Sequence, residues 1–237
     1  HAPLTWLSFI SGGIDAASLP GAGRDLLSGL LDCLLDHLRR GVLTEPGRAW
    51  RALAELRHPG VIHTARQLFH RGKESAEMYR CLAAVCSRDV EDLLVKATGT
   101  ATERLKPVLI ETLGAVRDRD TLLLLGQAAS SNRRADRLAA SRALGRCRRK
   151  GAASLLQRLA GDPDPDVACA ALDSIAYSRD ADAMPALSAM VARMGDPIVR
   201  ARLAAVAAVL GGEDARRLLA SMLADRSPEV AAEAAQG

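Results

Sequence analysis

Two groups of side chains have the residue types and spacing that could do chemistry. The first is the pair Cys33 and His37, which lie four residues apart with acids beside them at Asp32 and Asp36. Positions four apart share one face of a helix, and thiolate and imidazole are ligands that zinc prefers. A metal site needs three or four converging ligands, and the sequence contains no CxxC or HExxH motif to supply the others. We therefore predict no metal and no other cofactor.

The second group is the basic run at 133–150. It holds eight Arg or Lys against the single acid Asp136, a local charge of +7, whereas the whole chain carries only +4. The remainder is net negative (4 − 7 = −3), so the basic character is concentrated in one segment. This run could bind an acidic protein surface or a phosphate backbone, or it could be a solvated helix. The candidate anion-binding residues are Arg133, Arg134, Arg142, Arg146, Arg148, Arg149 and Lys150.

The neighbours of these basic residues favour one class of partner. Proteins that bind single-stranded nucleic acid place stacking aromatic rings among their charges, and the run at 133–150 contains no aromatic residue. We therefore expect an acidic or extended protein segment as the partner, with nucleic acid as the alternative.

Motifs for nucleotide binding and nucleophilic catalysis are absent from the sequence. It contains no GxxxxGK[ST] loop, no GxGxxG after a predicted strand and no GxSxG elbow. We therefore predict no catalytic residues and a function that is not enzymatic.

The composition limits the fold and the compartment. Nearly half of the residues are hydrophobic, but only 2 Trp, 2 Tyr and 2 Phe are present, so the apolar content is mostly Ala, Leu and Val. Ala and Leu have high helix propensity, which favours an all-α fold. The 5 cysteines are an odd number without paired spacing, and no apolar run is long enough for a membrane span. We expect a bacterial cytoplasmic protein that makes no membrane contact.

A pair of small or apolar residues recurs through the chain at steps of 29 to 32 residues. The residue four positions earlier is apolar at every step, which places both on one face of a helix. The residue directly before each pair is never bulky. These marker pairs are Leu53–Ala54, Leu82–Ala83, Leu113–Gly114, Leu144–Gly145, Ile175–Ala176 and Ala207–Ala208.

Each repeat contains a second apolar stretch after a short turn, which predicts a unit of helix A, turn and helix B. A single hairpin cannot bury both apolar faces, so neighbouring units must stack. We predict a right-handed α-α superhelix of about six helix pairs at 45–237, with the last one truncated. An N-terminal helical cap is predicted at 1–44, including an amphipathic helix at 24–40. The predicted B helices are 61–69, 90–97, 121–129, 153–160, 183–191 and 215–223.

Two stretches carry a family resemblance. DPDPDVACAALDSIA (162–176) and DPIVRARLAAVAAVLG (196–211) resemble the DPxVRxxAxxALG pattern of HEAT repeats, especially the short subtype of phycobilin-lyase-type proteins. The resemblance spans about 45–237 and is strongest at 130–237. It implies that Arg137 and Arg200 bridge adjacent repeats. It also keeps a bilin-lyase-like role as a second alternative.

The resemblance further implies that the B helices line the concave surface, where their outward positions form a ladder. A mostly polar ladder suits an extended or helical protein segment, so we expect a scaffold or adaptor. One column of the ladder is His63, Asp92, Leu123, Ser154 and Arg217, and the other is Gln67, Lys96, Gln127, Arg158 and Ser221.

Overall fold

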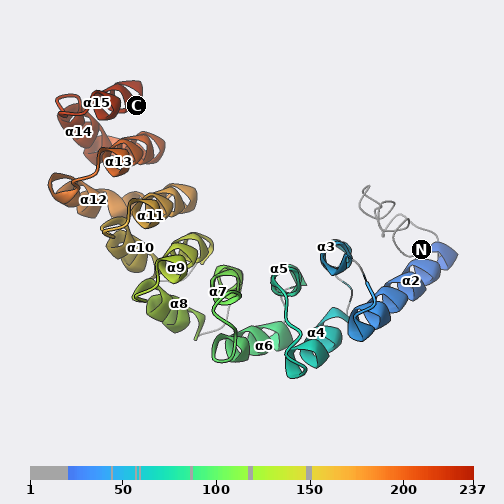
Figure 1. The fold of residues 1–237 in the computed structure, drawn as a ribbon. Helices are drawn as coiled ribbons and strands as arrows, with labels where there is room; N and C mark the ends of the chain where they lie inside the picture. Colours follow the sequence, from blue (N-terminus) through green and yellow to red (C-terminus); the bar gives the residue numbers. More distant parts are fainter. Residues whose placement is uncertain are drawn as a thin grey trace. The chain divides into compact units, whose positions relative to one another are not determined.

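The computed structural model describes residues 21–43, 45–56, 58, 60–85, 88–116, 120–147 and 151–237, without the side chains of 22–24, 88 and 181. Within these ranges the regular elements are all helices, and no strand occurs. The prediction of an all-α solenoid of helix pairs is confirmed (Figure 1). The chain divides into two compact units, 1–112 and 113–237.

The first unit contains A and B helices in alternation after one long helix. That long helix is α2 (Gly21–Arg40). The A helices are α3 (Pro46–Glu55), α5 (Ala76–Val85) and α7 (Lys106–Leu113), whose last residue belongs to the second unit, and the B helices are α4 (Gly60–His70) and α6 (Arg88–Thr98).

The second unit continues the alternation and ends on an A helix. Its A helices are α9 (Arg134–Arg146), α11 (Pro165–Ser178), α13 (Pro197–Leu210) and α15 (Pro228–Gln236), and its B helices are α8 (Thr121–Ala129), α10 (Ala152–Ala160), α12 (Met184–Met190) and α14 (Gly212–Met222). Two short 3-10 segments flank α12, at Ala181–Ala183 and Val191–Arg193. These bounds confirm the predicted B helices to within a few residues.

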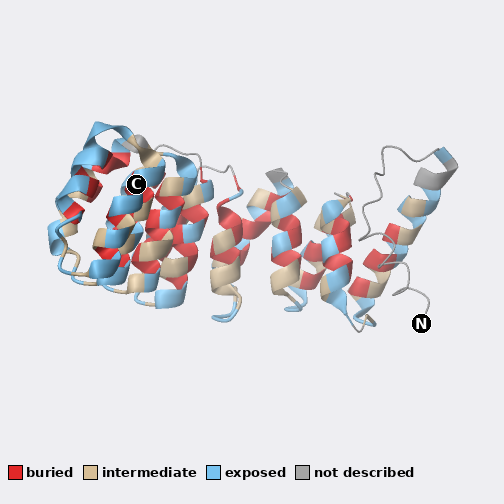
Figure 2. Ribbon diagram, turned by 90° about the horizontal axis from the view of Figure 1, so that it is seen from above, coloured by how far each residue is buried: buried red, intermediate tan, exposed pale blue. Residues whose placement is uncertain are grey.

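The marker column forms the core of both units. The first residue of each marker pair is buried, and so is the apolar residue one helical turn before it (Figure 2). Burying a Leu or Ile side chain contributes roughly 1.5–3 kcal/mol, so this column is a major source of stability. The buried residues are Leu53, Leu82, Leu113, Leu144, Ile175 and Ala207, together with Ala49, Met78, Leu109, Ala140, Ala171 and Leu203.

Small residues let consecutive A helices of the second unit approach closely. A Cβ on Gly114 would lie 2.5 Å from the backbone oxygen of Ala143, and a Cβ on Gly145 would lie 2.7 Å from Cβ of Ser174. Each contact joins the second marker residue of one repeat to the small residue before the marker of the next repeat. The hydroxyl of Ser174 also donates to the backbone oxygen of Ser141 on α9 at 2.9 Å.

This close approach is confined to one side of the second unit. Consecutive A helices, such as α9 and α11, contact each other far more extensively than consecutive B helices, such as α8 and α10. The shorter spacing therefore lies on the A-helix side. The expectation that the B helices line a concave surface does not hold for this unit, because the small columns pull the A helices together.

Asp–Pro turns start two of the A helices. The carboxylate of Asp164 accepts from the backbone N–H groups of Asp166 and Val167, and Pro165 occupies the first turn of α11. Asp196 caps α13 in the same way through the N–H of Ile198. These caps satisfy amide groups that have no partner within the helix.

The amphipathic helix predicted at 24–40 is found as α2, but its apolar face is shorter than expected. Leu31, Leu34, Leu35 and Leu38 are buried, whereas Leu26 is 65% exposed. The buried positions show that α2 packs on α3 and α4 through its C-terminal half. Residues 1–20 of the predicted cap lie outside the described residues.

Candidate binding surfaces

Two arginines at the fourth residue of an A helix link neighbouring repeats. Arg137 of α9 binds both carboxylate oxygens of Asp162, at 2.8 and 3.2 Å, and donates to the backbone oxygens of Ser131 and Asn132. The Asp162 carboxylate lies in the turn that leads to the next A helix. The expectation that Arg137 bridges repeats is confirmed.

Arg200 of α13 repeats this arrangement two repeats further on. Its guanidinium binds the two oxygens of Asp225 at 2.8 and 3.0 Å and donates to the backbone oxygens of Met194 and Gly195, both at 2.9 Å. The side chain is buried, so its charge depends on these four acceptors. Its expected bridging role is also confirmed.

The repeat between these two bridges lacks both partners. The fourth residue of α11 is Ala168, and the turn position equivalent to Asp162 and Asp225, three residues before the next A helix, is Met194. An arginine in place of Ala168 would be buried without a carboxylate to pair with. The absence of Arg therefore matches the absence of Asp, which indicates that the bridge forms as a unit.

Three of the ionisable groups in the two bridges have pKa values shifted toward the charged form. The hydrogen bond to Asp162 raises the pKa of Arg137, and the hydrogen bond to Asp225 raises the pKa of Arg200. In return, the hydrogen bond from Arg200 and the backbone N–H of Ser227 hold the pKa of Asp225 below its usual value. These shifts favour the charged forms of Arg137, Arg200 and Asp225.

Part of the basic run at 133–150 is neutralised by neighbouring acids. Arg134 pairs with Asp164 at 2.7 Å and also with Asp166, both at the start of α11. The acid within the run, Asp136, is buried and accepts from the hydroxyl of Ser131 at 3.0 Å. Arg134 and Arg137 thus serve contacts between repeats. Arg148, Arg149 and Lys150 lie outside the described residues.

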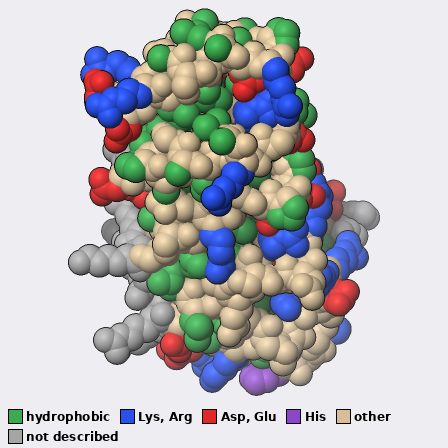
Figure 3. Space-filling model, turned by 90° about the vertical axis from the view of Figure 1, so that its left-hand side faces the viewer, with side chains coloured by type: hydrophobic (Ala, Val, Ile, Leu, Met, Phe, Trp, Pro, Cys, Tyr) green, Lys and Arg blue, Asp and Glu red, His purple; other side chains and the backbone are tan. Residues whose placement is uncertain are grey.

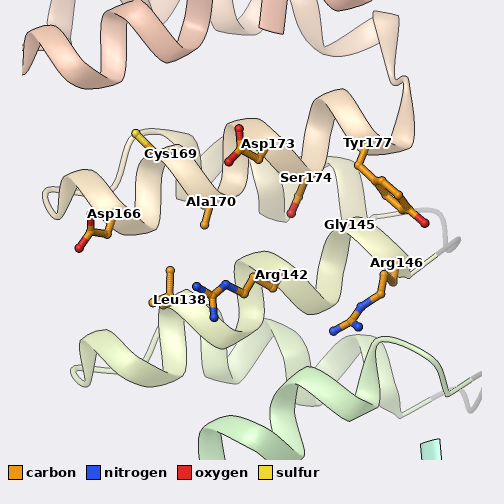
Figure 4. Close-up of a pocket in the computed structure, with 10 residues that line it drawn as sticks. All are labelled: Leu138, Arg142, Gly145, Arg146, Asp166, Cys169, Ala170, Asp173, Ser174 and Tyr177. Atoms are coloured by element: carbon orange, nitrogen blue, oxygen red, sulfur yellow. The ribbon is translucent and has the colours of Figure 1, made fainter. Parts of the chain in front are cut away.

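The structure places Arg142 and Arg146 together on one outward stripe of α9. Both are exposed, one helical turn apart, whereas Arg133 is half-buried at the N-cap of the same helix. Arg142 and Arg146 line a groove of about 610 Å³ between α9 and α11 (Figure 4). All of its lining residues come from these two A helices: Leu138, Arg142, Gly145, Arg146, Asp166, Cys169, Ala170, Asp173, Ser174 and Tyr177.

The opposite wall of this groove comes from α11. Tyr177 is 75% exposed, and its ring extends toward Arg146 (Figure 4). The carboxylate of Asp173 points away from α9 and lies 3.5 Å from the guanidinium of Arg202 on α13. On the α9 side, Arg142 and Arg146 line the groove, and the Arg146 side chain extends away from α11 (Figure 4).

A second hollow of about 790 Å³ adjoins this groove at the C-terminal ends of α9 and α11. The two share Gly145, Arg146 and Tyr177 as lining residues, and residues of α10 also line the second hollow. Arg179, the C-cap of α11, also lines it and adopts the left-handed backbone conformation, with φ of 53°. A further cation therefore flanks the end that holds Tyr177.

The residues of the predicted ladder lie on the B helices and point outward. Nine of the ten are exposed, and Gln67 is partly buried. Several contact neighbours: Gln67 and His63 lie 2.9 Å apart, and Arg158 donates to Ser130 at 3.0 Å. Arg217 pairs with Glu213 at 3.3 Å. Figure 3 shows that basic side chains on the B-helix face of the second unit lie scattered among apolar and other atoms.

The Cys33–His37 pair does not gather further ligands. The thiol of Cys33 lies 3.5 Å from Nδ1 of His37, which also approaches the backbone oxygen of Cys33 at 2.7 Å. Among the described residues, no group of three or more His, Cys, Asp or Glu side chains could hold a metal ion. A helix long and apolar enough to cross a membrane is also not found in this part of the chain.

Sequence reasoning missed Tyr177 and the groove beside it. The repeat register contains the signal, because Arg142 and Asp173 occupy the same position of consecutive repeats, as do Arg146 and Tyr177. Aligning the outward positions of the A helices, rather than those of the B helices alone, would have brought these four residues together.

Comparison with known families agrees with this repeat architecture. The family model for HEAT repeats matches residues 121–208, which run from α8 into α13. No curated protein matches the sequence. Residues 121–208 therefore match the HEAT-repeat family.

Proposed function

We propose that this chain is a non-enzymatic scaffold that binds a protein partner along the outward face of its B helices. The observation that carries the proposal is the stack of HEAT repeats in the second unit, which presents side chains at a regular spacing. HEAT repeats commonly mediate protein–protein interaction. Repeat stacks of this kind offer extended surfaces to partners.

The stack is braced in a way that suits a scaffold. The Arg137–Asp162 and Arg200–Asp225 bridges tie turns of successive repeats together, and the Ser174–Ser141 hydrogen bond joins α11 to α9. A surface that is ordered before binding loses less conformational entropy when the partner arrives. The proposed contact surface therefore does not need to fold on binding.

Four ladder residues of the second unit form the proposed contact surface. Leu123 is 63% exposed on α8, Gln127 follows one turn later, and Ser154 and Arg158 are their counterparts on α10. This set offers one apolar anchor, two polar groups and one cation. Such a mixture fits a helical or extended protein segment better than a phosphate backbone.

Nucleic-acid binding through the basic run is the second candidate. The exposed pair Arg142 and Arg146 favours it, but the Asp164 and Asp166 carboxylates already neutralise Arg134. Nucleic-acid binding would appear as salt-dependent retention of the chain on DNA.

Affinity purification from cells of the source organism tests the scaffold proposal. The wild-type chain is compared with a Gln127→Glu/Arg158→Glu variant, and bound proteins are quantified by mass spectrometry after nuclease treatment. We expect at least one protein at a stoichiometric level with the wild type and a loss of about tenfold or more with the variant, which corresponds to about 1.4 kcal/mol of binding energy.

The matched control is Arg216→Glu/Ala220→Glu on α14, where both side chains are exposed and neither belongs to the predicted ladder. It should leave recovery of the bound protein unchanged. No stoichiometric protein with the wild type, or equal recovery with the Gln127/Arg158 variant, would exclude the proposed surface.

A further inference from the structure

A further groove of the second unit lies between two consecutive B helices, α10 and α12 (Figure 1). Its volume is about 900 Å³, and it ends on the turns that lead into α11 and α13. Ser154 and Arg158 of the proposed contact surface line it. A segment that lies along that surface would therefore also meet this groove.

The groove opens beside a short B helix. The helix α12 spans only Met184–Met190 and continues as the 3-10 segment Val191–Arg193. It contacts α10 and α13 sparsely, whereas α10 packs extensively on α11. Sparse packing on one side of α12 leaves room for an added side chain without displacement of a helix.

The inner surface is mostly apolar, and the missing arginine bridge contributes to this. Met194 occupies the turn position at which Asp162 and Asp225 bind their arginines in other repeats. Met190 also lines the groove, and its Cε would lie 2.8 Å from a Cβ on Gly161. Both methionines are half-buried. Methionine side chains adapt to apolar groups of different shapes, so the groove can accept a large apolar side chain.

Two arginines, one from each side of the groove, carry the positive charge. Arg158 of α10 donates to the hydroxyl of Ser130 at 3.0 Å, which is a neutral acceptor. Arg193 follows α12, is exposed and forms no ion pair or hydrogen bond with the described part of the chain. Neither guanidinium is therefore paired with an acid of the described residues.

The two acids that line the groove have partners elsewhere. Both oxygens of the Asp162 carboxylate are bound by Arg137. The Asp196 carboxylate accepts from the backbone N–H of Ile198 at 2.7 Å and caps α13. The groove thus offers two cations to a ligand, whereas its carboxylates serve the fold.

We propose that this groove binds a segment of the protein partner that inserts one large apolar side chain and places a carboxylate against Arg158 or Arg193. The inference rests on the proposed function and deepens it by naming the side chains that the partner brings. Guanidinium groups bind carboxylates through paired hydrogen bonds, and a buried apolar anchor supplies much of the energy of an interface. We expect Leu, Met or Phe in the partner, with Asp or Glu within one helical turn.

The composition of the groove favours a peptide over a nucleic acid. Channels for single strands stack successive bases on several aromatic rings and follow the backbone with many cations. The described residues that line this groove include no aromatic side chain, and most of their surface is apolar. An apolar side chain next to a carboxylate matches these features better than a base and a phosphate.

Selection from a random 12-residue peptide display library on the immobilised full chain tests the proposal. We expect the selected peptides to be enriched in a large apolar residue close to Asp or Glu. Synthetic copies labelled with fluorescein would then be measured by fluorescence anisotropy against the wild type and the variants below.

Two substitutions separate the apolar and the charged contributions. Ala189 is exposed on α12 and lines the groove, so Ala189→Phe should fill it and lower peptide affinity about tenfold or more. Arg193→Glu should also lower the affinity about tenfold, whereas Arg193→Lys keeps the charge and should cost only about threefold. Neither residue belongs to the predicted ladder.

Matched controls make the same changes on α14. Ala220→Phe and Arg216→Glu alter exposed side chains that do not line the groove. Both should leave the peptide affinity within about twofold of the wild-type value, which is under 0.5 kcal/mol. Circular dichroism would show whether each variant keeps its helical content.

The methionines give a readout that needs no substitution. The chain has 5 of them, and methyl NMR of protein labelled with ¹³C at Met Cε resolves them individually. A bound peptide should shift the signals of Met190 and Met194. The signals of Met78, which lies in the other unit, and Met222, which is buried on α14, should stay unchanged.

Several results would overturn this inference. Failure to select peptides, peptides without the apolar and acidic pair, or affinities unaffected by Ala189→Phe and Arg193→Glu would each refute it. Competition by a dT20 oligonucleotide with the same dependence on Arg193 would assign the groove to nucleic acid instead.

Failure of the scaffold proposal would look different. Gln127 lies on α8 and does not line the groove, so Gln127→Glu should leave peptide affinity unchanged. Peptides that bind as expected without a stoichiometric partner from cells would refute the scaffold proposal alone. A partner recovered equally by the wild type and by Ala189→Phe would refute the groove alone.

Discussion

The arginine bridges show how single side chains hold the repeats in register. Arg200 is buried and its guanidinium meets the Asp225 carboxylate and two backbone oxygens. Isolated surface ion pairs contribute little to stability, whereas removing one partner of a buried pair is costly. The repeat that carries Ala168 and Met194 avoids this cost by lacking both partners.

Replacing Arg200 with Leu should destabilise the chain. The substitution leaves the backbone oxygens of Met194 and Gly195 and the Asp225 carboxylate without their donor, and each acceptor left without a donor costs about 1–3 kcal/mol. Urea unfolding followed by circular dichroism would measure the change. Arg216→Leu, at an exposed position, should change the midpoint little; equal effects of the two would contradict the bridging role.

The stability of the fold at acidic pH should depend on the carboxyl groups of Asp225 and Asp164. The pKa of Asp225 is lowered by Arg200, and the pKa of Asp164 is lowered by the N–H of Val167 and by Arg134, although burial opposes this. A carboxyl group whose pKa is lower in the folded chain than in the unfolded chain stabilises the fold at pH values above its unfolded pKa of about 4. This stabilisation is lost as the pH falls through the pKa of the folded chain.

We therefore expect the urea midpoint to fall as the pH drops below about 4. Asp225→Asn should be less stable at pH 7 and should show a smaller fall in acid, because it has no carboxylate to protonate. A parallel fall for the wild type and the variant would mean that this carboxyl does not contribute to the pH dependence.

At the scale of the helices, small residues decide which face of the second unit is tightly packed. Gly114 and Gly145 let α9 and α11 each pack closely on the preceding repeat, whereas consecutive B helices such as α8 and α10 contact each other much less. The repeat pattern revealed these small positions, but it did not show which neighbour they face. The concave side was therefore assigned to the wrong helices.

Gly114→Ala and Gly126→Ala form a matched pair that tests this packing. A Cβ at 114 would lie 2.5 Å from the backbone oxygen of Ala143, whereas a Cβ at 126 would meet Leu155 at an ordinary 3.8 Å. Gly114→Ala should destabilise the chain by about 1–3 kcal/mol, as overpacking does. Gly126→Ala, inside α8, should stabilise it by up to about 1 kcal/mol. Calorimetry would compare the two.

Helix boundaries were predictable because their signals are local. The second apolar stretch of each repeat predicted the B helices to within a few residues. The ion pairs of Arg134, the exposure of Leu26 and the groove at Tyr177 were not predictable in this way, because they depend on which helices become neighbours.

At the scale of the whole molecule, the energy of a repeat protein is a sum of local units and their interfaces. Leu144 of α9 is fully buried in the second unit, and the chain divides into two compact units at residues 112 and 113. Damage to the core of one unit should therefore spread little along the chain.

Leu144→Ala should lower local stability by about 2–5 kcal/mol through loss of buried area and the cavity left behind. Hydrogen–deuterium exchange should accelerate in peptides from α9, α10 and α11 and stay unchanged in peptides from α3, α4 and α5. Uniform acceleration along the chain would show a single cooperative unit instead.

We propose that the stacked repeats bind a protein through outward side chains of the second unit. A photo-crosslinking amino acid placed at Leu123 or at Arg216, followed by irradiation of intact cells of the source organism, tests it most directly. Both positions are exposed on B helices. We expect one dominant protein adduct from position 123 and little from position 216. Adducts only to nucleic acid, or equal adducts from both positions, would contradict it.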